Sequence, residues 1–150
     1  MKFVTYSYEN KEAVGILTED ETAVIPAKSL GFRADSMNGL IDELGGRLPE
    51  LPAAPETLSL AEVRLEAPIP VPKQDVICLG LNYRDHAEEA TKADAVFDVQ
   101  RGDAVYFAKR LQRAVAPNDS IDGHFDICDS LDYEVELAVI IGRDAKNVRA

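Results

Sequence analysis

A short segment near the end of the chain places the strongest restriction on the fold. Residues Leu131–Gly142 first alternate between acidic and apolar side chains and then become apolar until the glycine. This run of β-branched and aliphatic residues predicts a strand. Because side chains alternate between the two faces of a strand, Asp132, Glu134 and Glu136 are expected to project together. The fold must therefore accommodate three neighbouring carboxylates beside a stretch with the composition of a buried strand.

Two environments relieve the repulsion within this acidic row. Like charges at this spacing repel, and burial removes the water that stabilises them. A hard divalent cation such as Mg²⁺, Mn²⁺ or Ca²⁺ takes carboxylate oxygens as ligands and neutralises the row. A half-exposed edge strand, with its acidic face in water, relieves the repulsion as well. Both interpretations stay open from this segment alone.

The composition argues against several classes of protein. The 150 residues include 27 acidic and 16 basic side chains, which gives a formal net charge of −11. A nucleic-acid partner calls for a basic patch, so we expect none. No apolar run approaches the roughly 18 residues of a membrane span, and the N-terminus lacks the layout of a signal peptide. We therefore expect a cytoplasmic protein with no membrane partner, in which Cys78 and Cys128 are reduced.

The first third of the chain predicts a small domain without a reactive site. Residues 2–26 alternate and are punctuated by polar turns, which predicts an antiparallel meander of three strands. A short helix follows, capped by Asp35 or Ser36 and ended by Gly45-Gly46. The carboxylates of this region are scattered at turn positions, as on a solvated surface.

Two groups of prolines mark the domain boundaries. Proline disfavours helix and favours an extended connection. The first group punctuates residues 48–60, and the second has prolines at alternate positions, Pro68, Pro70 and Pro72. We therefore place a small N-terminal domain at residues 1–70 and the start of a second domain at residues 71–150.

The second domain opens with a strand that leads into a polar helix. Asp75–Gly80 predicts a short apolar strand, and the residues that begin with Arg84 have helical composition. On that helix His86 and Glu89 are three residues apart and share a face. A histidine oriented by a carboxylate serves as a general base near neutral pH. An ordinary surface pair explains the same spacing.

Another strand is predicted at Ala104–Lys109. Lys109 at its end is a candidate for holding an anionic substrate, although a solvated charge at a sheet edge gives the same pattern. The preceding residues, Lys92–Gly102, are polar and irregular, which favours a mobile loop.

His124, Asp126 and Cys128 alternate in the manner of transition-metal ligands. Their segment is turn-rich, and it supplies no second half of a ligand set. We therefore interpret these residues as part of a turn and not as a metal site.

Three segments in the second half of the chain resemble the fumarylacetoacetate hydrolase family. They are Ile77–Glu89, Tyr106–Lys109 and Leu131–Gly142, and they follow the family's order and approximate spacing. The resemblance covers roughly residues 68–150. It implies an α+β, mostly β fold, in which a small N-terminal domain precedes the first part of a mixed-β catalytic domain. Family members usually dimerise, so a homodimer is expected.

The resemblance also implies a metal site. Family enzymes hold a divalent cation, commonly Mg²⁺ or Mn²⁺, with three carboxylates, two of which map onto Glu134 and Glu136. Asp132 is then a neighbour of the site. The third carboxylate is expected after Gly142, beyond Ala150. On this reading the chain is the N-terminal part of a longer enzyme.

The catalytic residues follow from the same resemblance. The family's base maps onto His86, with Glu89 as its partner, while Lys109 and Arg84 are expected to bind the substrate. Two features depart from the family pattern, because Arg110-Leu111 follows the lysine and a leucine precedes Asn82. Both leave the substrate open.

The expected activity is metal-dependent hydrolysis or lysis of a carbon–carbon bond in an acylpyruvate-type oxo acid. The cation stabilises an enolate in such a reaction. Isomerases, hydratases and decarboxylases of related 2-oxo acids share this enolate and are the alternatives. A non-catalytic cation-binding module is a further alternative if the chain is complete.

Overall fold

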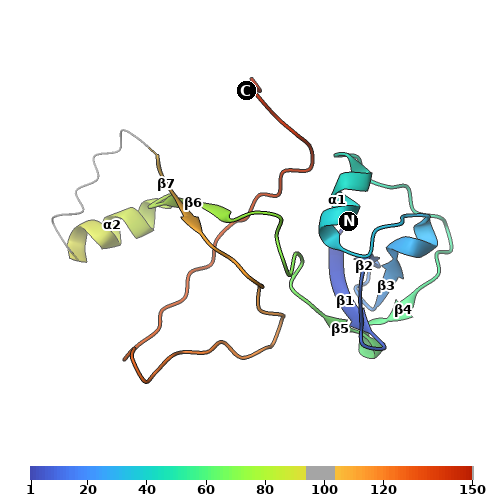
Figure 1. Cartoon of the computed structure of the whole chain (residues 1–150), viewed down its shortest axis with the longest axis horizontal. Helices are drawn as coiled ribbons and strands as arrows, with labels where there is room; N and C mark the ends of the chain where they lie inside the picture. Colours follow the sequence, from blue (N-terminus) through green and yellow to red (C-terminus); the bar gives the residue numbers. More distant parts are fainter. Residues whose placement is uncertain (94–103, 150) are drawn as a thin grey trace. The chain divides into compact units, whose positions relative to one another are not determined.

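The computed structural model describes residues 1–93 and 104–149 (Figure 1). By its internal contacts the chain divides into two compact units. Unit 1 comprises Met1–Pro70 and Arg113–Ala150, and unit 2 comprises Val71–Gln112. The division into domains at 1–70 and 71–150 stays a prediction. The predicted loop at 92–102 lies outside the described residues, apart from its first two positions.

Unit 1 contains a five-stranded antiparallel sheet with the strand order β4-β3-β2-β1-β5. The strands are β1 (Phe3–Tyr8), β2 (Lys11–Leu17), β3 (Ala23–Pro26), β4 (Leu58–Ser59) and β5 (Arg64–Leu65). Its helical elements are the 3₁₀ turns η1 (Ala27–Leu30) and η2 (Leu60–Glu62) and the helix α1 (Met37–Leu44). The predicted meander is confirmed by β1, β2 and β3.

Local chemistry fixes the register of the meander. Glu9 and Asn10 both have positive φ, at 49° and 61°, as a two-residue hairpin between twisted strands requires. In β2, Gly15 lies so close to β3 that an added Cβ would stand 2.5 Å from the Ile25 carbonyl oxygen. A glycine is therefore needed where these two strands approach each other.

The core of unit 1 lies where α1 packs with residues of the sheet and of the connecting segments. The Ser36 hydroxyl caps α1 by accepting a hydrogen bond from the Gly39 N–H at 3.3 Å, and Gly45 ends it at φ 55°. Leu40 is completely buried. The buried core cluster comprises Val14, Ala27, Ala34, Met37 and Leu40. The predicted helix is thus confirmed, with Ser36 as its cap.

Unit 2 is a two-stranded antiparallel ribbon with one helix. Its elements are β6 (Val76–Gly80), α2 (Arg84–Ala93) and β7 (Val105–Lys109). The two strands pair from Val76 opposite Lys109 to Gly80 opposite Val105. All three elements form where the sequence predicted them. With the sheet of unit 1, they confirm the α+β, mostly β fold class.

The strand predicted at Leu131–Gly142 does not form. No residue of this segment belongs to a strand, and Figure 1 shows it as an irregular trace. Tyr133, Val135 and Leu137 are 85%, 86% and 82% exposed. A strand is stable only when a neighbour satisfies its backbone N–H and C=O groups, and no strand within residues 1–93 and 104–149 pairs with this segment. The prediction of a strand that continues into a buried apolar run was therefore wrong.

Candidate active site

The predicted catalytic residues follow the loop that joins β6 to α2. Leu81, directly after β6, has a φ of 49°, in the left-handed region that costs a leucine about 1 kcal/mol or more. The Tyr83 carbonyl then accepts the Ala87 N–H at 3.0 Å, which closes the first turn of the helix. Asp85 in the first turn and Lys92 in the last complement the helix dipole. The strained Leu81 backbone therefore lies directly before the helix that carries the predicted catalytic residues.

Helix α2 carries three of the predicted site residues. Arg84 begins the helix, and His86 and Glu89 follow in it. All three are exposed. Because residues three apart on a helix are neighbours, His86 and Glu89 share one face, as the sequence predicted. Both side chains are accessible to solvent.

Lys109 ends β7 in the same unit as α2. Its backbone pairs with that of Val76, and its ammonium lies 5.7 Å from the centre of the Phe107 ring. This separation is within the range of a cation–π contact, which restrains the lysine without neutralising its charge. Lys109 is exposed and remains able to attract an anion.

The predicted metal ligands belong to unit 1. Glu134 and Glu136 are exposed residues of the irregular segment, separated by Val135. Within the described ranges, no three His, Cys, Asp or Glu side chains gather as a metal cluster. The predicted site therefore draws its base and substrate cation from unit 2 and its metal ligands from unit 1. The assembly of these groups into one site stays a prediction.

The segment around His124 forms a turn, as interpreted from the sequence. The His124 carbonyl accepts the N–H groups of both Ile127 and Cys128 at 2.9 Å. Its ring Nδ1 lies 3.7 Å from a carboxylate oxygen of Asp122. The Cys128 thiol donates to the Ser130 carbonyl at 2.9 Å. Both cysteines are free, with Cys78 buried and Cys128 half-buried.

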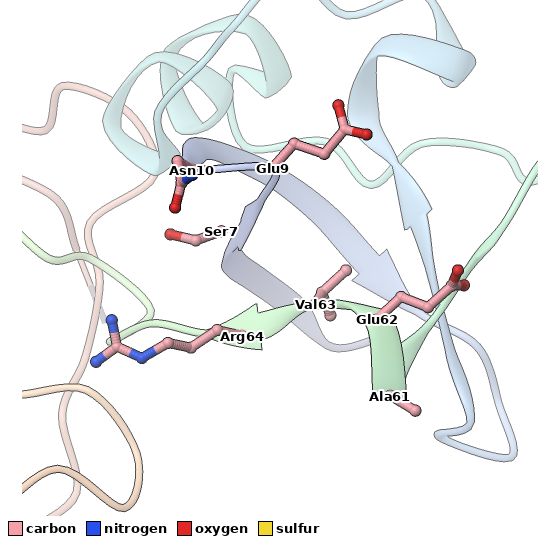
Figure 2. A pocket seen from close by; sticks show the side chains of 7 residues that line it. All are labelled: Ser7, Glu9, Asn10, Ala61, Glu62, Val63 and Arg64. Atoms are coloured by element: carbon pink, nitrogen blue, oxygen red, sulfur yellow. The ribbon is translucent and has the colours of Figure 1, made fainter.

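An open hollow of about 610 Å³ lies on unit 1, and none of the residues predicted for catalysis lines it. It is lined by Ser7, Glu9, Asn10, Ala61, Glu62, Val63 and Arg64. Figure 2 shows the Glu62 and Arg64 side chains extending to opposite sides. In a site that binds a small anion, charged groups converge on one point. The charged side chains that line this hollow do not. We therefore assign it no catalytic role.

One buried acid was not predicted from the sequence. Glu66 is 8% exposed and follows β5 directly. Its position between Leu65 and Ala67, just before a proline, is the signal that sequence reasoning overlooked. A carboxylate is almost never this buried unless it is paired.

No helix within the described part of the chain is long and apolar enough to span a membrane.

Similarity to known proteins extends over nearly the whole chain. The family model described as "Fumarylacetoacetate (FAA) hydrolase C-terminal" matches residues 75–150. The oxaloacetate tautomerase YisK of Bacillus subtilis is 31% identical over 167 residues, which cover 99% of this chain and 54% of that protein. A fumarylacetoacetate hydrolase domain-containing protein 2 homolog of Dictyostelium discoideum is 40% identical over 91 residues, which cover 61% and 27%.

A solved structure supports the same relationship. It is the fumarylacetoacetate hydrolase of the psychrophilic Exiguobacterium antarcticum, with a TM-score of 0.58 and 26% sequence identity. The match covers 85% of this chain and 42% of that one. The chain spans about half the length of the curated relatives that match it over 99% of its residues.

Proposed function

The chain belongs to the fumarylacetoacetate hydrolase family, and from this premise we propose that the protein interconverts the keto and enol forms of oxaloacetate or a close 2-oxo acid. The observation that carries the proposal is the similarity to an oxaloacetate tautomerase, at 31% identity over 99% of the chain. The expected hydrolysis of carbon–carbon bonds becomes the second candidate. Both reactions pass through an enolate, so the same residues serve either one.

The proposed reaction moves one proton within the substrate. A base removes a proton from C3 of oxaloacetate, the electron pair forms the C2–C3 double bond, and the keto oxygen takes up a proton. No atom is gained or lost. His86 is the proposed base, because its exposed ring on α2 is able to approach a bound molecule. Glu89, on the same helix face, orients the ring.

Cationic side chains hold the substrate in this proposal. Oxaloacetate carries two carboxylates, whereas the chain has a net charge of −11 and repels anions overall. Local cations are therefore required. Arg84 offers a planar fork that suits a carboxylate, and Lys109 offers a point charge at the end of β7.

The proposed cofactor is a divalent cation, Mg²⁺ or alternatively Mn²⁺ or Ca²⁺. Glu134 and Glu136 supply hard carboxylate oxygens, which is the donor type these ions prefer. Both side chains are exposed, so a cation is able to reach them. When bound, the cation supplies Lewis-acid stabilisation of the negative charge that develops on the keto oxygen.

A specific observation keeps carbon–carbon hydrolysis as the second candidate. The matching family model and the structurally similar Exiguobacterium protein are both named for fumarylacetoacetate hydrolysis. In that reaction His86 would take a proton from water instead of from carbon. The residue assignments are unchanged, and only the substrate and the proton donor differ.

We also propose that the protein forms a homodimer. The ribbon of unit 2 exposes large apolar side chains, including Ile77 and Tyr106, each 68% exposed. Exposed apolar patches commonly mark interaction surfaces. Light scattering coupled to gel filtration checks this: a dimer mass is expected, and a monomer mass at high concentration would refute it.

A comparison of two substrates tests the proposed activity. The enol of oxaloacetate absorbs in the ultraviolet, so ketonisation is followed by the decay of that absorbance against a buffer control. We expect the protein with Mg²⁺ to accelerate this decay far more than it accelerates cleavage of acetylpyruvate. Cleavage of acetylpyruvate without acceleration of the tautomerisation would favour the hydrolase instead. No acceleration of either reaction would contradict both candidates.

A further inference from the structure

The chain leaves and re-enters unit 1 through two neighbouring segments, which we call the neck. The neck consists of residues 64–70, which lead into unit 2, and residues 113–119, which return from it. The Ala114 N–H donates to the Pro70 carbonyl at 2.7 Å. Pro70, the last residue before unit 2, is thus joined to Ala114, the second residue after it, by a backbone hydrogen bond within unit 1.

Glu66 is the buried centre of the neck. It accepts a hydrogen bond from the Ser7 hydroxyl at 2.6 Å. Its carboxylate also pairs with a cation from each arm of the neck, with Arg64 at 3.3 Å and Arg113 at 3.8 Å. Only 7% of its side chain is exposed, so these three groups replace the water that it loses on folding.

Each of the two arginines that pair with Glu66 also pairs with a second carboxylate. Arg64, from the outgoing arm, reaches Asp119 of the returning arm at 2.5 Å. Arg113, from the returning arm, reaches Glu12 of β2 at 2.9 Å. The pKa of Arg64 is raised by its hydrogen bond to Asp119 and by the charges of Asp119 and Glu66. Each arginine therefore connects a neck arm to another part of unit 1.

The outgoing arm is also bound to the centre of the sheet. The Glu66 N–H donates to the Thr5 carbonyl at 2.9 Å, and the Thr5 hydroxyl donates to the Pro68 carbonyl at 2.7 Å. Thr5 has no exposed surface. One arm is therefore anchored to β1 by backbone and hydroxyl contacts, whereas the returning arm is attached through the ion pairs and the Ala114 bond.

We propose that Glu66 is a positioning residue that locks the returning arm of the neck and so holds the ends of the segment that carries His86 and Lys109. This inference rests on the proposed function for its catalytic consequence. Exposed ion pairs contribute little by themselves. The same pairs matter here because they compensate a buried carboxylate. Removing the charge of Glu66 removes the attraction that holds both arginines to it.

Amide hydrogen exchange resolved by residue tests the lock without reference to activity. Glu66→Gln keeps the size of the side chain and an acceptor for Ser7 but removes the charge. We expect the Ala114 amide to exchange about tenfold faster or more, since its local opening no longer breaks the ion pair between Arg113 and Glu66. The Gly45 amide, which caps α1, should exchange at an unchanged rate. Glu19→Gln, at an exposed turn position, is the charge-matched control.

A second variant guards against a general loss of folding. The Arg113 side chain is half exposed, so Arg113→Met is expected to fold. It removes the pairs with both Glu66 and Glu12 and should accelerate exchange at Ala114 at least as much as Glu66→Gln. The double variant with Glu66→Gln should exceed the larger single effect by little, because both changes break one network. Equal acceleration at Ala114 and Gly45 would show global destabilisation and would overturn the local lock, as would unchanged exchange at Ala114.

Steady-state kinetics separate positioning from simple stabilisation. In the oxaloacetate assay, Glu66→Gln should lower kcat about tenfold, while Glu19→Gln should leave it unchanged. Faster exchange at Ala114 with an unchanged kcat would overturn the positioning role. If the unmodified protein has no tautomerase activity, the proposed function fails, and the exchange result still decides whether Glu66 locks the neck.

Discussion

The N-terminal sheet and the acidic segment at Leu131–Gly142 have similar strand-forming compositions, yet only the sheet forms. Strands β1, β2 and β3 are joined by short turns, so each finds its partner next to it in the chain. Within residues 1–93 and 104–149 the acidic segment has no such neighbour, and its apolar side chains are exposed. Strand propensity therefore becomes structure only where a pairing partner is available.

The residues that form the core of unit 1 differ from those proposed for catalysis. The core of unit 1 is formed by buried side chains such as Leu40 and Val24, both with no exposed surface. The residues proposed for catalysis, including His86 and Glu134, are exposed. Changes in the first group should affect folding, and changes in the second should affect activity alone.

The largest expected effect is on activity. His86→Gln removes the proposed base, so kcat for oxaloacetate tautomerisation should fall by roughly 10²–10⁴-fold. Because the side chain is exposed, the thermal unfolding midpoint should change little. Stopped-flow absorbance and a thermal melt on the same sample measure both. Full activity in this variant would contradict the assignment of the base.

The next effect contrasts two leucines. Leu40→Ala leaves a cavity in the core of unit 1 and should destabilise that unit by about 2–5 kcal/mol. Leu137→Ala changes a side chain that is 82% exposed, so its effect should stay within about 0.5 kcal/mol. Chemical denaturation of each variant gives the free energies of unfolding. Similar losses for both would show that the acidic segment is packed in solution.

A smaller effect is expected at the closest approach of two strands. Gly15→Ala would place a methyl group 2.5 Å from the Ile25 carbonyl oxygen and 2.6 Å from a Val24 methyl group. The strands must separate to admit it, at about 1–3 kcal/mol. Gly31→Ala adds a methyl group in open space, but at a φ of 89°, so it isolates backbone strain from crowding. A neutral Gly15→Ala would contradict the described register of β2 and β3.

The smallest effect concerns the helix cap. Ser36→Ala removes the hydroxyl that accepts the Gly39 N–H and should destabilise unit 1 by about 1 kcal/mol. Ser36→Asp restores an acceptor, so its stability should return close to that of the original protein. Urea denaturation compares the three proteins, and a loss in the aspartate variant equal to that in the alanine variant would argue against capping.

Local signals made the meander and the helix of unit 1 predictable. The polar turn at Glu9-Asn10 and the Ser36 cap each act on residues beside them, so sequence alone identified the hairpin and the helix. The strand–helix–strand order of unit 2 followed from similar signals. These elements depend on contacts between residues that are close in the chain, which a single sequence displays.

Contacts between distant residues were not predictable. The fate of Leu131–Gly142 depended on a pairing partner, which no pattern within the segment reveals. Glu66 binds Ser7, which lies 59 positions earlier in the chain. The candidate site is intermediate, because α2 was predicted with His86 and Glu89 on one face, whereas their relation to Glu134 depends on distant parts of the chain.

The most direct test of the proposed function is the dependence of oxaloacetate tautomerisation on Mg²⁺ in the unmodified protein and in Glu134→Gln. We expect chelation to abolish the catalysed rate and added Mg²⁺ to restore it in the unmodified protein. Glu134→Gln should remain inactive at the same Mg²⁺ concentration, while Glu50→Gln, an exposed control, should behave normally. Catalysis that survives both chelation and Glu134→Gln would contradict the account.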